Sequence, residues 1–110
     1  MPPQWLDEDV GLSVITAAEL LVGVLRSDID RRARREAFVE ALLDTLAVLP
    51  FELVDARIYA RVRADLAAMG ITIDHHDLQI AATALSRGWS VATTNFADFG
   101  RVPGLTLWQF

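Results

Sequence analysis

The chain has 110 residues, of which 53% are hydrophobic, and a formal net charge of −5. This length and hydrophobic content predict one globular domain over residues 1–110. Cysteine is absent, which excludes a disulfide framework, a thiolate zinc site and a cysteine nucleophile. The apolar runs are too short for a membrane span and the N-terminus lacks a basic leader, so we expect a soluble, cytoplasmic protein without membrane contacts.

The first half of the chain alternates between strand and helix patterns. Residues 10–15 are rich in β-branched side chains and predict a short strand, with Thr16 as the N-cap of a following helix. Apolar residues recur at helical spacing from residue 17 until a polar stretch that begins at Arg26. A second helix is expected over about residues 29–46, and residues 47–49 form a candidate short strand.

The second half continues the alternation. A helix that opens at Asp55 carries apolar residues inward until Gly70, and residues 75–87 form a second, strongly apolar helix that Gly88 ends. Residues 90–93 and 105–108 are candidate strands, separated by a turn or short helix at residues 96–99. Strands that alternate with helices predict an α/β fold with a mainly parallel sheet.

Acidic side chains follow the predicted strands. Ligands of such folds bind at the carboxyl ends of the strands. Glu19 follows the first strand, Asp77 lies in the first turns of the apolar helix, and Asp98 follows residues 90–93 together with Asn95. Converging carboxylates suit Mg²⁺ or Mn²⁺, and two such ions can hold a scissile phosphate and activate water. The pattern therefore indicates phosphodiester hydrolysis as a hypothesis.

Each of these acids also has a purely structural interpretation. Glu19 stands three residues after Thr16, as in a capping box. Asp77 could complement a helix dipole, although a lone carboxylate at a buried helix end is costly without a cation. Asp98 and Asn95 could serve turn geometry alone.

The histidines and tryptophans carry weaker signals. His75 and His76 are adjacent and point in different directions, so we interpret them as cap and loop residues, with His76 a minor candidate for a substrate contact. Trp89 and Trp108 flank predicted strands and are expected to pack in or beside the core.

The basic residues are all arginine, and four of them lie between residues 31 and 35. The negative net charge argues against a protein that binds any polyanion. Acids gathered around metal ions would reverse the local field, so RNA remains open as a substrate.

Three segments carry a resemblance to a known family. They read Ser-Val-Ile-Thr-Ala-Ala-Glu-Leu-Leu-Val-Gly at residues 13–23, His-Asp-Leu-Gln-Ile-Ala-Ala-Thr-Ala-Leu at residues 76–85, and Thr-Thr-Asn-Phe-Ala-Asp-Phe-Gly-Arg-Val-Pro-Gly-Leu at residues 93–105. In this order and spacing they resemble VapC-type PIN domains. The resemblance runs from about residue 10 to the end, and it implies a PIN-like three-layer α/β fold with a mainly parallel central sheet.

The resemblance also implies a function. VapC-type PIN domains are Mg²⁺- or Mn²⁺-dependent endoribonuclease toxins, silenced by a VapB-type antitoxin and usually paired as homodimers. By resemblance, Glu19, Asp77 and Asp98 match the second, third and fourth acidic positions, which bind the metal. Asn95 matches a polar residue that assists them, and Thr93 one that orients the cluster.

The sequence departs from the family pattern at two places. A complete relative opens with a hydrophobic strand that carries the first catalytic aspartate, whereas here six residues lead directly into Asp7, Glu8 and Asp9. We interpret Asp7 and Asp9 as solvated loop acids and expect a fold with the first strand missing, closed by rearrangement or by a partner, or a shortened gene model. Thr94 stands where an arginine is frequent, which puts a substrate contact at that position in doubt.

Two functions follow from these patterns. The leading hypothesis is a metal-dependent endoribonuclease that hydrolyses RNA, impaired here by loss of the first aspartate. The alternative is an inactive PIN module that acts through antitoxin binding or dimerisation.

Overall fold

A computed structural model of the chain describes residues 10–93 and 95–109. These residues form two compact units, 10–50 and 51–109, and each unit is described by itself. The interpretations of Asp7, Asp9 and Thr94, and of the segment before residue 10, lie outside the described residues. One domain over residues 1–110 stays a prediction.

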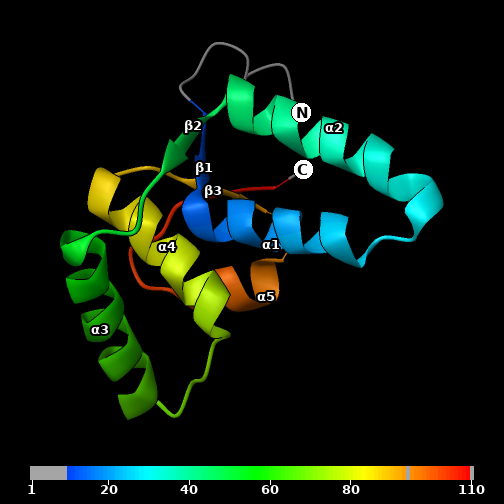
Figure 1. Cartoon of the computed structure of the whole chain (residues 1–110). Helices are drawn as coiled ribbons and strands as arrows, with labels where there is room; N and C mark the ends of the chain where they lie inside the picture. The colour runs from blue at the N-terminus through cyan, green and yellow to red at the C-terminus, as the bar shows by residue number, and fades with distance from the viewer. Residues whose placement is uncertain (1–9, 94, 110) are drawn as a thin grey trace. The chain divides into compact units, whose positions relative to one another are not determined.

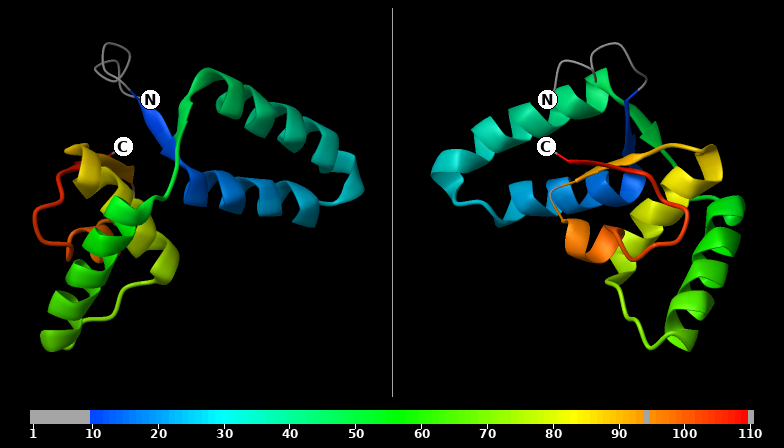
Figure 2. Two further views of the ribbon diagram at one scale, coloured as in Figure 1. Left: turned by 60° about the vertical axis from the view of Figure 1, so that its left-hand side comes forward. Right: turned by 180° about the vertical axis from the view of Figure 1, so that it is seen from behind.

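The first unit holds two strands and two helices in the order β1 (Gly11–Ser13), α1 (Val14–Arg26), α2 (Ile29–Thr45) and β2 (Ala47–Leu49). β1 and β2 pair in parallel, with Gly11 opposite Ala47. Figures 1 and 2 show α1 and α2 as a helical hairpin that connects the two paired strands and extends to one side of them. The predicted strands and helices are present, although β1 is shorter than residues 10–15 because α1 begins at Val14.

The start of α1 differs from the prediction. Ser13, the last residue of β1, is the N-cap, and its Oγ accepts a hydrogen bond of 3.1 Å from the Ile15 N–H. Thr16 lies inside the helix, so its assignment as the cap is wrong. Because a small hydroxyl residue can end a strand and cap a helix at once, β1 passes into α1 without a loop.

The turn between α1 and α2 is held by side chains. Asp28 caps α2 by accepting from the Arg31 N–H at 3.1 Å. Arg32 reaches back from α2, and its Nη2 donates to the carbonyl oxygens of Leu25 at 3.1 Å and Ser27 at 3.2 Å. These bonds satisfy carbonyl groups that the end of a helix leaves without partners.

The second unit contains α3 (Leu53–Ala68), α4 (His75–Arg87), β3 (Val91–Thr93), α5 (Phe96–Phe99) and β4 (Leu107–Gln109). β3 and β4 pair in parallel, with Val91 opposite Leu107. Both strand pairs are thus parallel, which confirms the predicted α/β class. α3 begins two residues before the predicted start because Glu52, not a later residue, is its N-cap.

The core of the second unit forms where α3 packs against α4. Small side chains on α4 suit a close approach of the two helices, since Ala81 and Ala84 are buried in one cluster with Val62 and Leu66 of α3. Fully burying one leucine or valine stabilises a fold by about 1.5–3 kcal/mol, so this cluster is the main apolar contribution to the unit. Its buried members are Val62, Leu66, Ile73, Leu78, Ala81, Ala84, Val91, Phe99 and Val102.

Both ends of α4 are defined by local chemistry. Asp74 is the N-cap, and its Oδ1 accepts from the N–H groups of His76 at 2.9 Å and Asp77 at 3.3 Å. The interpretation of His75 and His76 as cap and loop residues is therefore wrong, because both lie in the first turn. Gly88 ends the helix as predicted, with a φ of 67° that favours glycine.

Trp89 packs against the core cluster, which confirms the packing role expected for it. Over the ranges that the structure describes, no helix is both long and apolar enough to span a bilayer.

Asp55, in the first turn of α3, is completely buried at 0% exposure. Its Oδ2 accepts from the Glu52 N–H at 2.7 Å, and its Oδ1 accepts from the Ser86 hydroxyl and from Arg87 Nη1 at 3.0 Å. Burial raises the pKa of this carboxyl, but the bonds from Glu52 and Ser86 and the charge of Arg87 hold the pKa below its ordinary value. The carboxylate thus joins the start of α3 to the end of α4.

We predict that Asp55→Asn lowers the free energy of unfolding by about 3 kcal/mol at neutral pH, because the substitution removes the buried charge that Arg87, the Ser86 hydroxyl and the Glu52 N–H all contact. A lowered folded-state pKa stabilises the fold above the ordinary aspartate range, and this stabilisation is lost as pH falls through the folded-state pKa. Wild-type stability should therefore fall on acidification more steeply than that of the variant. Denaturant unfolding followed by circular dichroism between pH 7 and about pH 3 measures both effects.

Asp65→Asn is the matched control, since Asp65 lies on the same helix and is exposed. It should change stability by less than about 0.5 kcal/mol. Equal losses in the two variants would contradict the assigned role of Asp55.

Candidate active site

The turn after β3 holds two of the predicted site residues. The Thr93 hydroxyl oxygen accepts from the Asn95 N–H at 2.9 Å. Asn95 is the N-cap of α5: its Oδ1 accepts from the Asp98 N–H at 3.4 Å, and its Nδ2 donates to Asp98 Oδ2 at 3.3 Å. The structure therefore brings Asn95 and Asp98 together at the carboxyl end of a parallel strand.

The turn-geometry interpretation accounts for Asn95 but not for the Asp98 carboxylate. Asn95 uses its side chain to start a helix, as a cap does. Among the described residues, the half-buried Asp98 carboxylate accepts one long bond, from Asn95, and no arginine pairs with it. Asp55, by contrast, has both oxygens occupied. Asp98 keeps oxygen lone pairs available for a cation.

Asp77 lies in the same unit as Asp98. It is half-buried in the first turn of α4, and α4 packs against α5. Asp77 and Asp98 thus occupy the first turns of two helices in contact. The positive end of the α4 dipole also favours a carboxylate at Asp77, so the dipole interpretation of Asp77 stands beside the metal interpretation.

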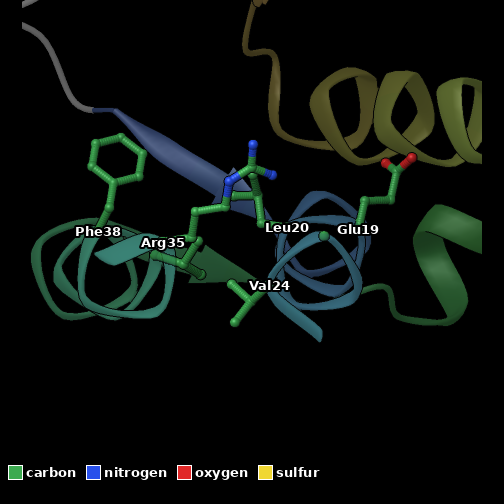
Figure 3. A pocket seen from close by; sticks show the side chains of 7 residues that line it. Glu19, Leu20, Val24, Arg35 and Phe38 are labelled. Carbon is green, nitrogen blue, oxygen red and sulfur yellow. The ribbon is translucent and has the colours of Figure 1, made fainter. Parts of the chain in front are cut away.

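Glu19 belongs to the first unit. Its exposed side chain projects from α1 and lines one end of a pocket of about 260 Å³ between α1 and α2. Figure 3 shows its carboxylate directed away from Arg35 and Phe38, which line the same pocket. The capping-box interpretation is wrong, because Ser13 and not Thr16 caps α1.

The predicted metal set of Glu19, Asp77 and Asp98 draws on both units and stays a prediction. Within either unit, the described residues contain no group of three or more Asp, Glu, His or Cys side chains placed to hold a metal ion. The chemistry of the set does fit Mg²⁺ or Mn²⁺, which prefer carboxylate and amide oxygens. Asp98 provides carboxylate oxygens, whereas Asn95 turns its Nδ2 toward Asp98 Oδ2 and uses its Oδ1 to accept from the Asp98 N–H.

One polar cluster was not expected from the sequence. The hydroxyl oxygen of Tyr59, on α3, lies 3.3 Å from His75 Nδ1. The same oxygen accepts a hydrogen bond of 3.0 Å from Arg63 Nη1. Tyr59 and Arg63 are four residues apart on one helix, a spacing that brings side chains together. No local pattern places His75 beside them, because it follows in the chain sixteen residues after Tyr59.

The chain is similar to known proteins over most of its length. The family model of the PIN domain matches residues 3–105. Ribonuclease VapC1 of Rickettsia felis is 41% identical over 95 residues, which cover 86% of this chain and 71% of that protein. The chain thus spans about 71% of the length of this relative.

Two solved structures share the fold. The crystal structure of VapBC2 from Rickettsia felis, bound to a promoter DNA fragment, has a TM-score of 0.87 at 27% identity, covering 94% of this chain and 77% of that chain. The crystal structure of VapBC-5, a member of the VapBC family of toxin-antitoxin systems from Mycobacterium tuberculosis, has a TM-score of 0.79 at 39% identity, covering 92% and 80%. The chain belongs to the PIN-domain family and is homologous to the VapC ribonucleases.

Proposed function

We propose that this chain is a VapC-type endoribonuclease toxin of the cytoplasm that hydrolyses RNA phosphodiester bonds with the help of Mg²⁺ or Mn²⁺. The observation that carries the proposal is the incompletely paired Asp98 carboxylate, held by Asn95 at the carboxyl end of β3 in a PIN domain. A relative named as a ribonuclease at 41% identity supports the reaction class.

Each residue of the proposed site has a separate task. Asp77 and Asp98 supply carboxylate oxygens from the first turns of α4 and α5, and Glu19 supplies a third carboxylate from α1. Asn95 orients Asp98 through Nδ2, and Thr93 fixes the Asn95 backbone. When bound, the divalent ion supplies Lewis-acid stabilisation of the charge that develops on the phosphate.

We also propose a VapB-type antitoxin as partner, on the ground that the solved relatives include VapBC structures. The pocket between α1 and α2 is a suitable surface for it. Phe38 on its rim is 65% exposed, and Leu25 on α1 is 71% exposed. An amphipathic segment could cover such a groove with apolar side chains. We expect the toxin itself to be a homodimer.

The second candidate function is an inactive PIN module that binds the antitoxin or a sister protomer without cleaving RNA. The exposed apolar side chains of α1 and α2 favour it, because they serve partner binding whether or not the carboxylates bind metal. This candidate expects antitoxin binding without affinity for Mn²⁺.

We predict that Asp77→Asn and Asp98→Asn each weaken Mn²⁺ binding strongly. Loss of a residue that only supports a metal ligand usually weakens affinity by roughly 10- to 100-fold, and loss of a ligand itself should weaken it by more. Cleavage of single-stranded RNA in Mn²⁺ should fall in parallel. Calorimetric titration and a gel assay of RNA cleavage measure the two effects.

Asp65→Asn is the control for these variants, because Asp65 is an exposed acid outside the proposed site. It should bind Mn²⁺ like the wild type. Saturable Mn²⁺ binding and cleavage that survive both site substitutions would refute the assignment. Absence of Mn²⁺ binding in the wild type, with antitoxin binding retained, would establish the inactive module instead.

We predict that Phe38→Ser weakens binding of a cognate VapB-type antitoxin by roughly 30-fold, because exposed aromatic anchors carry about 2 kcal/mol or more at interfaces. Leu53→Ser is the matched control, since Leu53 is similarly exposed but belongs to the second unit. Surface plasmon resonance with the purified proteins measures both affinities. Equal affinities for the two variants would exclude the pocket as the docking surface.

A further inference from the structure

Arg63, Tyr59 and His75 form a hydrogen-bonded cluster on the surface of the second unit, and it lies outside the proposed metal site. The Tyr59 hydroxyl accepts from Arg63 at 3.0 Å and lies 3.3 Å from His75 Nδ1. A guanidinium can only donate, so the hydroxyl proton of Tyr59 is free to be donated to His75 Nδ1. In that arrangement the imidazole carries its own proton on Nε2, and Arg63 and His75 both present N–H donors.

The cluster is held in place by packing. The ring of Phe51 meets the half-buried ring of Tyr59 edge-on, with centroids 6.4 Å apart and an interplanar angle of 86°. Arg63 Cζ lies 5.9 Å from the centroid of the Tyr59 ring. A cation that is already oriented loses less side-chain freedom when it binds a ligand. Arg63 is therefore more ordered than an ordinary surface arginine.

Within the described ranges, Arg63 has no carboxylate at ion-pair distance. The acid nearest in sequence to His75 is Asp74, whose Oδ1 already accepts from the N–H groups of His76 and Asp77. A fixed, exposed and uncompensated cation with adjacent N–H donors is suited to an anion such as a phosphate. The protein has a net charge of −5, so its overall charge does not account for an uncompensated cation at this surface.

The cluster lies beside the proposed site but on another side of the same helix end. His75 is the first residue of α4 and Asp77 the third, and side chains two positions apart on a helix do not face each other. A strand of RNA that crosses the start of α4 would meet Asp77 and then His75 and Arg63. A phosphate held by the cluster would thus be a flanking one and not the scissile one.

We infer that Arg63 and His75 bind a flanking phosphodiester of the RNA substrate, with Tyr59 as the residue that positions both. The inference rests on the proposed ribonuclease function and deepens it by naming where the substrate backbone is held. Contacts of this kind orient a nucleic acid without reading its sequence.

The test is the affinity of the full chain for a fluorescent single-stranded RNA, measured by anisotropy in Mn²⁺ over a range of NaCl concentrations. All proteins carry Asp77→Asn so that the RNA stays intact. Arg63→Gln should weaken binding about 10-fold and lower the slope of log affinity against log salt by about one, as the loss of one phosphate contact does. Tyr59→Phe, which removes only the hydroxyl, should weaken binding in the same direction.

Arg61→Gln is the matched control, because Arg61 is exposed on α3 two residues from Arg63 and is not part of the cluster. It should leave the affinity within about twofold of the parent and the salt slope unchanged. An Arg63→Gln protein that behaves like Arg61→Gln would overturn the inference. It would also be overturned if Arg63→Gln weakened binding of the antitoxin and left binding of RNA unchanged. Competition with inorganic phosphate should displace the RNA only weakly; tight phosphate binding that depends on Arg63 would mean a small-anion site and would also overturn it.

Failure of the proposed function has a different signature. In that case the chain with Asp77 intact would neither bind Mn²⁺ in calorimetry nor cleave RNA, and no variant would be needed to show it. With Mn²⁺ binding and cleavage present, an unchanged affinity in Arg63→Gln refutes only the phosphate contact. Thermal unfolding of every variant by circular dichroism confirms that the comparison is made between folded proteins.

Discussion

The buried carboxylate of Asp55 is the contact on which the second unit depends. It joins the first turn of α3 to the last turn of α4, where Ser86 and Arg87 follow Asp55 by 31 and 32 residues in the chain. With these two helix ends joined, the alanine-rich face of α4 packs on Val62 and Leu66. The opposite end of α4, where Asp77 lies, takes its position from this packing. A structural acid at one end of the helix thus supports a candidate functional acid at the other.

Acids of one chemical type have opposite roles in this unit because their hydrogen bonds differ. Asp55 accepts from a backbone amide, a hydroxyl and a guanidinium, so its charge is neutralised inside the protein. Asp98 accepts one long bond from an amide side chain within the part of the chain that the structure describes. A carboxylate that the fold leaves partly unsatisfied is the kind that a divalent cation stabilises. Membership of the PIN family and the homology to VapC ribonucleases agree with that chemistry.

Patterns of local origin were predicted well, and contacts between distant residues were not. Helical periodicity and Gly88 located α2 and α4 almost to the residue. Ser13 and Thr16 both suit a helix N-cap, and only the three-dimensional path of β1 decided between them. In the sequence Asp55 looks like an ordinary first-turn acid, and only the fold brings Ser86 and Arg87 into contact with it. The Tyr59 and His75 contact was invisible for the same reason. Grouping Glu19 with Asp77 and Asp98 came from family resemblance, since spacing carries no such information.

The order of elements in the first unit has a consequence for synthesis on the ribosome. Its two strands pair with each other and its two helices pack together, all within residues 10–50. Domains fold from the N-terminus as the chain emerges. Every internal partner of this unit has therefore been translated before α3 begins. The groove between α1 and α2, with Phe38 on its rim, is complete in sequence while the residues of α4 and α5 are still to be made. The proposed antitoxin surface is therefore synthesised before the carboxylates of the second unit.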